Sequence, residues 1–451
     1  MLNFSLSSTQ ISLRQKAREF AHREVLPVSW YFDEKDEVPL SVLKKAYKAG
    51  FLNSEIPEHY GGLGSGLVEA ALVTEEISAA CPGIATSVFD NALGLKPILL
   101  SSNESLKERI FSEILREFKL ICFATSEPTM GSDVAGMQCR AKREGKDFLL
   151  SGTKYWITNA GIADYMVIFA TVDPAEKHKG IGAFLVERKA PGVSVSPPIP
   201  KLGQRCSNTG GIRLQEVRVP AEQVLAPPGE GFVLAMRTFG KTRPIIGAFA
   251  VGAARSAMEY ALDYAKKRHT FGHPLAQNQA IQFKLAEMVQ MVETARLLVW
   301  KAAWETDQGL DNALSASMAK FYGAEMAMKV VQEALQIFGG YGYTRMFPIE
   351  KLFRDIRLFS IYEGTDEIQR SIVAAQILAG YRPVMPPLED LPLLREWDPS
   401  DTSEEMSRDR TAWRCRMCGH VHYGPEPPGN CPYCFFPKTM FKKIWPKAAE
   451  G

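Results

Sequence analysis

The sequence has little net charge and lacks any long apolar run. Its 53 Lys and Arg residues nearly balance its 51 Asp and Glu residues, so the net charge is +2. This balance favours neither nucleic acid nor an anionic membrane as a partner. No apolar run reaches the roughly 18–20 residues that a transmembrane helix needs, and the first residues lack the basic stretch and apolar core of a secretory signal. We therefore expect a cytoplasmic protein that has no membrane span and binds no nucleic acid.

Cysteine is sparse in the first 410 residues. Cys81, Cys122, Cys139 and Cys206 are scattered over more than a hundred positions, a spacing that is typical of buried thiols in a reducing compartment. The other four of the eight cysteines crowd together near the C-terminus, and this clustering needs a separate explanation.

Two Cys-x-x-Cys motifs, twelve residues apart, contain these four cysteines. The thiolates of Cys415, Cys418, Cys431 and Cys434 can form the tetrahedral site that zinc or a single iron prefers. A pair of disulfides is the alternative, which a reducing compartment disfavours. A segment of about forty residues has too small a core to fold without a metal. The motifs therefore predict a metal-binding domain.

The hydrophobic periodicity changes twice along the 451 residues, of which 46% are apolar. Helical spacing of three and four residues runs from about 8 to 117 and returns from 231 to 379. Between about 120 and 227, short apolar runs bounded by Gly, Asn and Asp predict strands. The pattern predicts an α+β fold with a helical domain (1–119), a β domain (120–228), a second helical domain (229–381), a proline-rich linker (382–410) and the metal-binding domain (411–451).

Glu363 is the strongest candidate for a catalytic group. It stands between Tyr362 and Gly364 in an apolar, otherwise helical region. Apolar surroundings disfavour the charged form of a carboxylate and raise its pKa, so such a group can accept a proton near neutral pH. Alone, the motif has a simpler explanation, because a surface Glu-Gly pair often ends a helix.

Two further segments are candidates for binding a carbonyl-rich ring or a phosphate. Residues 122–133 run from a predicted strand into a turn rich in small and hydroxyl residues, whose backbone N–H groups and hydroxyls can bind such a ligand. An ordinary turn is the alternative. Trp156 and Thr158 lie two residues apart on a predicted strand, so both side chains face the same side. This would place an aromatic wall beside a hydroxyl.

These motifs and several others resemble those of the acyl-CoA dehydrogenases, nearest to the medium-chain type. The resemblance runs from about residue 13 to residue 380 and keeps the motifs in order. The further motifs are IPEHYGGLG (56–64), GQRCS (203–207), RHTFG (268–272) and QIFGG (336–340).

The resemblance implies an FAD-binding homotetramer built from a helical domain, a β domain and a four-helix-bundle domain. In such enzymes one group of residues surrounds the isoalloxazine ring. The matching positions here are Phe123, Thr125, Ser126, Trp156, Thr158, Thr365 and Glu367. Gly131 and Ser132 match further cofactor-binding positions. A second group holds the pyrophosphate and adenosine, partly across a subunit boundary. Its matching positions are Arg268, Thr270, Phe271, Gln279, Gln336, Gly339 and Gly340.

The resemblance also implies the reaction. Glu363 would remove the α-proton of an acyl-CoA thioester while a β-hydride passes to FAD, which gives a trans-2-enoyl-CoA. The electrons would leave through an electron-transfer flavoprotein. The positions that match substrate contacts are Ser132, Arg243, Tyr362 and Gly364. Some relatives carry the base just before the arginine that matches Arg243; here Thr242 stands there, which leaves Glu363 as the base.

Four positions depart from the medium-chain pattern. Gly240 and Ala375 replace an aspartate and an arginine that contact CoA. Ala85 and Phe89 replace a glutamine and a glutamate at the far end of the acyl pocket, where an added ring could shorten or flatten the space. The chain length and branching of the acyl group therefore stay open, as does a cyclic or aromatic group.

The segment 411–444 resembles the rubredoxin-like tail of rubrerythrins, whose four cysteines hold one iron. Phe435 stands where many iron knuckles have glycine, so zinc stays open as the alternative metal. Iron is favoured, because FAD in the same chain gives an electron carrier a role.

Three other functions fit parts of the pattern. If the same site catalysed the reverse reaction, the protein would be an enoyl-CoA reductase that takes its electrons from reduced iron. A structural zinc would make the tail a protein-docking module of the same dehydrogenase. A flavoprotein scaffold that binds nucleic acid, as some relatives in the DNA-alkylation response do, is disfavoured by the retained Glu363 and by the near-neutral charge.

Overall fold

The structure of the protein, a computed structural model, describes residues 5–380 and 411–445. The predicted linker, 382–410, lies outside the described residues, as do the last residues of the predicted metal-binding domain. The chain divides into two compact units, Met1–Gly380 and Tyr381–Gly451.

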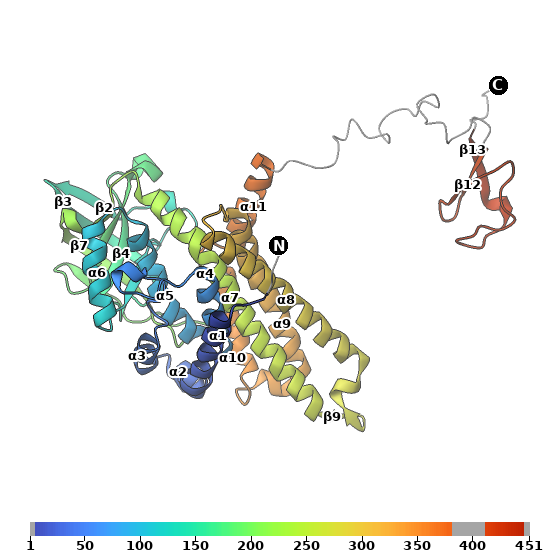
Figure 1. Ribbon diagram of the computed structural model, residues 1–451, viewed down its shortest axis with the longest axis horizontal. Coiled ribbons are helices and arrows are strands. Elements are labelled where there is room, and N and C mark those ends of the chain that lie inside the picture. Colours follow the sequence, from blue (N-terminus) through green and yellow to red (C-terminus); the bar gives the residue numbers. More distant parts are fainter. Residues whose placement is uncertain (1–4, 381–410, 446–451) are drawn as a thin grey trace. The chain divides into compact units, whose positions relative to one another are not determined.

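The large unit begins with six α-helices, and the strands of a β-sheet follow them in the chain (Figure 1). Serine caps the first of them: Ser7 accepts a hydrogen bond from the Gln10 backbone N–H while the Gln10 side chain accepts one from Ser7 N–H, as in a capping box. The helices are α1 (Ser8–Phe20), α2 (Leu26–Lys35), α3 (Leu40–Lys48), α4 (Leu67–Ala80), α5 (Pro82–Leu100) and α6 (Glu104–Arg116).

The middle of the large unit is an eight-stranded sheet, ordered β6-β7-β3-β2-β4-β5-β8, with β1 paired in parallel to β4. β4 is buried at every position, as its continuous apolar run predicts. The strands are β1 (Ile121–Ala124), β2 (Arg140–Glu144), β3 (Asp147–Thr158), β4 (Tyr165–Thr171), β5 (Ile181–Glu187), β6 (Val193–Val195), β7 (Thr209–Val219) and β8 (Val224–Ala226).

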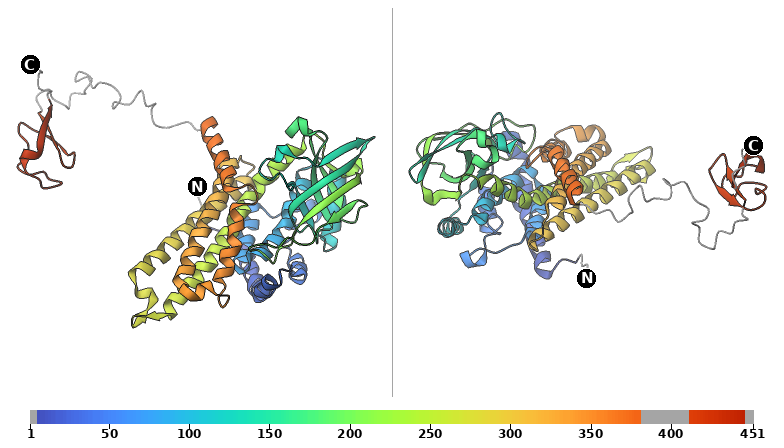
Figure 2. Two further views of the ribbon diagram at one scale, coloured as in Figure 1. Left: turned by 180° about the vertical axis from the view of Figure 1, so that it is seen from behind. Right: turned by 90° about the horizontal axis from the view of Figure 1, so that it is seen from above.

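Long helices then return and pack against one another (Figure 2). They are α7 (Gly231–Lys267), α8 (Gln279–Asp307), α9 (Ala313–Phe338), α10 (Ile349–Ile356) and α11 (Asp366–Gly380). The short pair β9 (His269–Thr270) and β10 (His273–Pro274) joins α7 to α8 at the far end of the bundle. The predicted order of helices, strands and helices is therefore confirmed.

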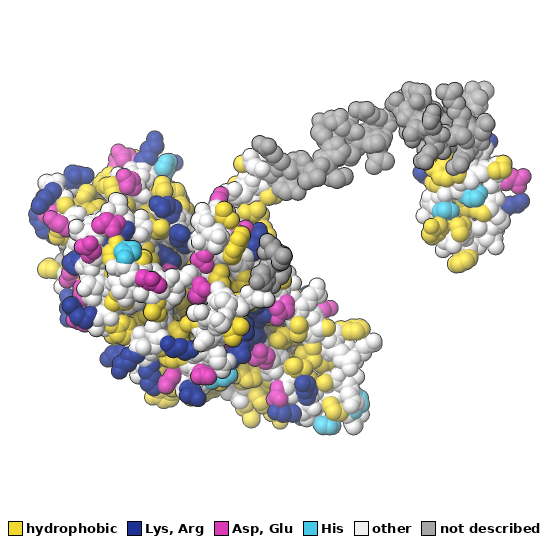
Figure 3. Space-filling view, in the orientation of Figure 1, with side chains coloured by type: hydrophobic (Ala, Val, Ile, Leu, Met, Phe, Trp, Pro, Cys, Tyr) yellow, Lys and Arg dark blue, Asp and Glu magenta, His cyan; other side chains and the backbone are white. Residues whose placement is uncertain are grey.

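α7 is long and apolar enough to cross a membrane by length and composition alone. However, 72% of its most apolar 18-residue window is buried inside the protein, which is what a core helix of a bundle requires. α7 packs against α4, α8 and α9. On the face shown in Figure 3, basic and acidic side chains are interspersed over the large unit.

The small unit contains a three-stranded antiparallel sheet, ordered β12-β11-β13. Its strands are β11 (Ala412–Cys415), β12 (Val421–Tyr423) and β13 (Phe441–Trp445). Its buried apolar cluster consists of Cys415, Cys431 and Phe441, with Trp413 and Cys434 packed against them. So small a cluster agrees with a need for a metal.

Candidate functional site

A cavity of about 910 Å³ lies in the large unit. It is bordered by α5, by the turn after β1, by the end of β3, by α7 and by the segment between α10 and α11. The predicted site residues that line it are Phe123, Thr125, Ser126, Gly131, Ser132, Trp156, Thr158, Arg243, Tyr362, Glu363, Gly364 and Thr365. Segments that lie far apart in the sequence thus line one cavity.

Glu363 lies in a tight turn at the start of α11. Its φ is 57°, in the left-handed region, and Gly364 follows with a φ of 88°. The left-handed conformation costs a non-glycine residue about 1–2 kcal/mol. The Gln369 side chain donates hydrogen bonds to the carbonyl oxygens of Glu363, at 3.2 Å, and of Gly364, at 3.1 Å. These bonds hold the strained turn and fix where the carboxylate points.

The Glu363 side chain is half-buried in the cavity wall, where a hydroxyl and two cations act on its carboxylate. Burial raises the pKa of Glu363 to about 7, against the hydrogen bond from Thr242 and the positive charges of Arg243 and Lys320, which lower it. The Thr242 hydroxyl donates to Glu363 Oε2 at 2.9 Å. A carboxylate with a pKa near neutrality is able to take and return a proton.

Two buried cations face this carboxylate from the bundle. Arg243 on α7 is buried, and its Nε has no hydrogen-bond partner among the described residues. Lys320 on α9 is fully buried and binds Asp366 Oδ1 at 2.8 Å. The ion pair ties α9 to the first turn of α11, next to the Glu363 turn.

The turn after β1 is built on a second buried ion pair. Lys154 Nζ donates to the Thr125 carbonyl at 2.9 Å and to Glu127 Oε1 at 2.8 Å. The Glu127 carboxylate also accepts from the backbone N–H of Gln138, at 2.8 Å, and of Cys139, at 2.9 Å. These bonds hold Thr125 and its neighbours against the end of β3.

Trp156 and Thr158 both line the cavity, but the simple alternation of side chains along a strand does not explain why both face it. The register of β3 against β7 shifts between Lys154 and Ile157, and the φ of Trp156 is 63°. A β-bulge at this point therefore changes the direction in which the Trp156 indole points. The Trp156 side chain is 58% exposed in the single chain.

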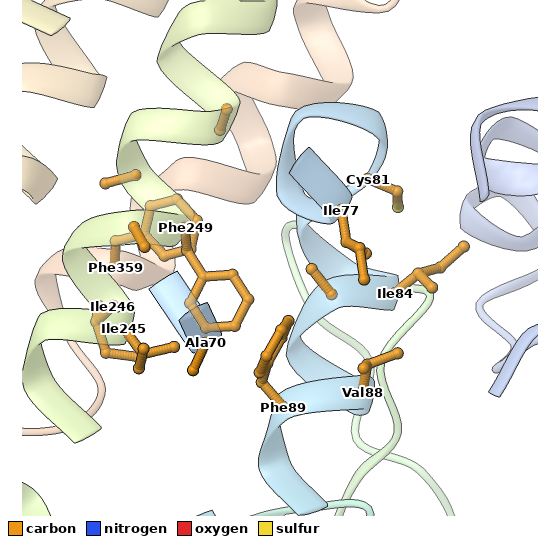
Figure 4. Close-up of a cluster of buried hydrophobic side chains, with 14 of the residues drawn as sticks. Ala70, Ile77, Cys81, Ile84, Val88, Phe89, Ile245, Ile246, Phe249 and Phe359 are labelled. Atoms are coloured by element: carbon orange, nitrogen blue, oxygen red, sulfur yellow. The ribbon is translucent and has the colours of Figure 1, made fainter. Parts of the chain in front are cut away.

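An apolar surface borders the cavity on the α5 side. Phe89 lines the cavity and packs edge-on against Phe249 of α7, with ring centroids 5.7 Å apart. Figure 4 shows the Phe89 ring pointing from α5 toward Ile245, Ile246 and Phe249. Ala85, predicted beside Phe89, is buried but is not among the lining residues.

The other predicted FAD positions lie elsewhere. They lie where α7 and α9 end and α8 begins, at the β9–β10 hairpin, and they are Arg268, Thr270, Phe271, Gln279, Gln336, Gly339 and Gly340. There the Arg268 guanidinium lies over the Tyr341 ring, 5.9 Å from its centroid, and Phe271 is 95% exposed. Glu367 lies in the first turn of α11, outside the cavity.

Positive charge dominates the cavity lining. Its acidic residues are Glu55, Asp90 and Glu363. Its basic residues are Lys96, Lys201, Lys241, Arg243, Arg354 and Arg357. Lys96 already pairs with Glu55, and Arg354 pairs with Asp33 and Glu350. The positive charge that favours an anionic ligand therefore comes from Lys201, Lys241, Arg243 and Arg357.

The small unit brings its four cysteines together as predicted. The Sγ atoms of Cys415, Cys418, Cys431 and Cys434 all lie within 4.8 Å of one another. The two knuckles are alike, because the backbone N–H of the residue after each one donates back to its first cysteine. Gly419 N–H donates to Cys415 O at 3.0 Å, and Phe435 N–H donates to Cys431 O at 2.9 Å. Phe435 therefore takes the left-handed φ, 59°, that Gly419 takes without strain.

Sequence reasoning missed three side chains that the site contains. They are Asp90, which lines the cavity, Lys320, which lowers the pKa of Glu363, and Gln369, which holds its turn. Asp90 and Lys320 carried one usable signal, a charged residue within an otherwise apolar helix.

Comparison with known proteins identifies the large unit. The models described as "Acyl-CoA dehydrogenase, N-terminal domain", "middle domain" and "C-terminal domain" match residues 7–117, 122–217 and 229–378. The chain belongs to the acyl-CoA dehydrogenase family. A fourth model, described as "Rubrerythrin, rubredoxin-like domain", matches residues 413–442. The predicted family and the predicted tail are thus both confirmed.

Relatives of this acyl-CoA dehydrogenase family member match over most of the large unit. The mitochondrial short-chain specific acyl-CoA dehydrogenase of Rattus norvegicus is 39% identical over 379 residues, 84% of this chain and 92% of the relative. The solved butyryl-CoA dehydrogenase of Megasphaera elsdenii superposes with a TM-score of 0.82 at 33% identity, over 84% of this chain and all of that one. A chain solved in work on the electron transferring flavoprotein of Acidaminococcus fermentans gives the same TM-score, identity and coverage.

Proposed function

We propose that the protein is an FAD-dependent acyl-CoA dehydrogenase in which Glu363 takes the α-proton of an acyl-CoA thioester. The observation that carries the proposal is the Glu363 carboxylate inside the cavity, with its pKa raised to about 7 by burial. A group with that pKa is partly ionised at neutral pH and accepts a proton there. The net positive lining fits the phosphates of CoA.

The residues at the cavity fit the ring of FAD. Thr125, Ser126 and Thr158 offer hydroxyls and backbone groups, and the half-exposed Trp156 offers an aromatic face. When bound, FAD supplies the acceptor for the β-hydride. The protein's own residues orient the thioester and hold the removed proton on Glu363, while Phe89 and Phe249 help to exclude water.

The second group of FAD positions fits a phosphate-bearing ligand. The Thr270 Oγ1 atom is buried without a partner among the described residues. Gly339 has a φ of 59° and a ψ of −137°, and no described atom lies within 4 Å of where a Cβ on Gly339 or Gly340 would stand. Such open glycine backbone lets a phosphate approach closely.

The two groups of FAD positions support an oligomer. Arg243, a predicted substrate contact, lines the cavity together with the first group, and Arg268 belongs to the second group. Along the axis of α7 these two residues lie roughly 38 Å apart. That is further than one FAD molecule extends. We infer that the second group belongs to the FAD of another copy, and that the chain forms the homotetramer that the resemblance implies.

We also propose that the four cysteines hold one iron and that electrons leave for an electron-transfer flavoprotein, with the iron domain as a relay. The four close Sγ atoms support a metal. In a chain that binds a flavin, an iron site can carry the electrons that the flavin receives. A structural zinc cannot, because zinc has no redox chemistry. The cytoplasmic location stays a prediction.

One experiment tests the reaction. The purified, FAD-loaded protein is mixed anaerobically with straight, branched and cyclic acyl-CoA thioesters, and oxidised flavin is followed by its visible absorbance. We expect bleaching with at least one thioester, and about 10³-fold slower bleaching in the Glu363→Gln variant, which keeps the shape of the base and removes its acidity. Equal rates in both proteins would overturn the assignment of Glu363.

A second measurement tests the metal. Iron bound by thiolates absorbs visible light and zinc does not, so the spectrum of the flavin-free protein, with metal analysis, separates the two. Zinc at one ion per chain would overturn the relay.

A further inference from the structure

Asp90 is an unexplained carboxyl group in the wall of the cavity. It lies on α5, on the same face as Thr86 and Phe89, and is only 7% exposed. Its Oδ2 is buried and has no hydrogen-bond partner among the described residues. Buried polar groups in native proteins nearly always have partners, so an orphan of this kind in a ligand cavity indicates that the ligand supplies one.

Asn91, the next residue on α5, is a buried polar residue whose hydrogen bonds are made within the protein. The Asn91 amide donates to Asn53 Oδ1 at 2.7 Å, and its oxygen accepts from the Ile121 backbone N–H at 2.7 Å. Asn91 is therefore bonded within the protein through both its nitrogen and its oxygen. Asp90 instead lies in the cavity lining, where it interacts electrostatically with Glu363, Tyr362 and the thiol of Cys122. Asp90 does not serve the fold in the way that Asn91 does.

The charge state of Asp90 follows from its surroundings. Burial, and then the negative charge of Glu363, raise the pKa of Asp90 well above its usual range. No cation binds it among the described residues. Both effects favour the neutral, protonated form of Asp90. A protonated carboxyl group presents an O–H donor to the cavity.

We infer that Asp90 is a specificity-determining residue that hydrogen-bonds an oxygen atom carried by the acyl group of the substrate. The inference rests on the proposed function, since it assumes that an acyl-CoA fills the cavity. The substrate class is then an acyl-CoA thioester whose acyl chain bears a hydroxyl or keto oxygen beyond the reacting carbons. A plain alkyl chain leaves the Asp90 donor unpaired, and a site built around a hydrogen bond rejects such an analogue strongly.

Matched pairs of substrates test this inference. Each pair has equal numbers of non-hydrogen atoms: 4-hydroxybutyryl-CoA with pentanoyl-CoA, 5-hydroxypentanoyl-CoA with hexanoyl-CoA, and 4-oxopentanoyl-CoA with 4-methylpentanoyl-CoA. In at least one pair we expect kcat/KM of the FAD-loaded protein to favour the oxygen-bearing member by about tenfold or more. Calorimetric affinities for the Glu363→Gln variant should show the same preference without turnover.

Variants of Asp90 separate its role from a structural one. Asp90→Asn keeps a donor of the same size and should keep most of the preference, whereas Asp90→Leu removes the donor and should reduce the ratio to about one. Thr86→Val is the matched control: Thr86 lines the same cavity one turn earlier, but its hydroxyl already donates to Gln204 Oε1 at 2.9 Å. It should change both members of a pair alike.

The outcomes distinguish the inference from the proposed function. If alkyl thioesters bleach the flavin and no pair shows a preference for its oxygen-bearing member, the role of Asp90 is overturned. The same holds if the kcat/KM ratio within a pair is unchanged in Asp90→Leu. Either result leaves the assignment as a dehydrogenase intact. A preference for 4-aminobutyryl-CoA over 4-hydroxybutyryl-CoA overturns the neutral oxygen class, because it requires an ionised Asp90. No bleaching by any thioester overturns the proposed function itself.

Discussion

The Thr242 hydroxyl is a hydrogen-bond donor to the catalytic candidate, Glu363. It donates to Glu363 Oε2 at 2.9 Å, and this bond stabilises the charged carboxylate. Its effect on the pKa of Glu363 is downward, against the upward effect of burial. Because only the ionised base can take a proton, activity should rise with pH through the pKa of Glu363 and be lost below it.

Thr242→Val should therefore move the pH profile of kcat/KM to higher pH. Losing a hydrogen bond to a charged group raises the pKa of Glu363, by roughly one unit, so the variant should lose activity most below pH 7 and recover it at high pH. Stopped-flow reduction of the flavin across pH 5.5–9 measures this (about two units either side of the base's pKa). Thr238→Val is the control, since Thr238 lies one turn earlier on α7 and donates only to the Leu234 carbonyl; equal shifts in both variants would contradict the role of Thr242.

At this scale the sequence predicted a candidate base but not the side chains around it. Glu363 was singled out because it stands between an aromatic residue and glycine in an apolar segment and because this motif, with several others, resembles those of the acyl-CoA dehydrogenases. Thr242, Lys320 and Gln369 were not, because they reach Glu363 only when α7, α9 and α11 pack together. Long-range side-chain contacts have no periodicity that a single sequence displays.

Among the elements, α9 and α11 are joined by a buried ion pair beside the site. Lys320 and Asp366 are both nearly excluded from water. Removing one partner leaves the other charge buried and unpaired, which costs more than the pair contributes. The pair therefore sets where α11, and with it the Glu363 turn, begins.

Lys320→Met should lower the free energy of unfolding by about 3 kcal/mol. It should also raise the pKa of Glu363, because the positive charge of Lys320 lowers it. Chemical denaturation of the FAD-loaded protein and its pH profile measure the two effects. Lys329→Met, on the exposed side of the same helix, should change stability by less than about 0.5 kcal/mol. Equal losses in the two variants would show that the buried pair has no special role.

The elements themselves were largely predictable. The apolar runs that became β3, β4 and β5 and the helical stripe in α8 follow the spacing that each structure requires. Strand alternation alone predicted that Trp156 and Thr158 face the same side. The β-bulge between Lys154 and Ile157 also decides where the Trp156 side chain points, and this bulge depends on the partner strand β7. A bulge is a property of a strand pair, and one strand's sequence does not contain it.

In the whole molecule, the cavity and the cysteine cluster belong to separate compact units. All of the residues that line the cavity lie in the large unit, and all four cysteines of the cluster lie in the small one. On the proposed function, we therefore expect reduction of flavin by a thioester to be independent of the small unit, and the small unit to depend on a metal for its fold.

Cys431→Ser should separate the two units functionally. It removes one of four ligands, so the small unit should lose its metal and its protease resistance, while the bleaching of flavin by acyl-CoA changes by less than about twofold. Metal analysis, limited proteolysis and anaerobic stopped-flow measure the three quantities. His420→Ala, close to the first knuckle but outside the cysteine cluster, should keep the metal. If Cys431→Ser slowed the bleaching as much as it slowed turnover with an electron acceptor, the metal would act on the chemical step itself, and its role as a relay after flavin reduction would be wrong.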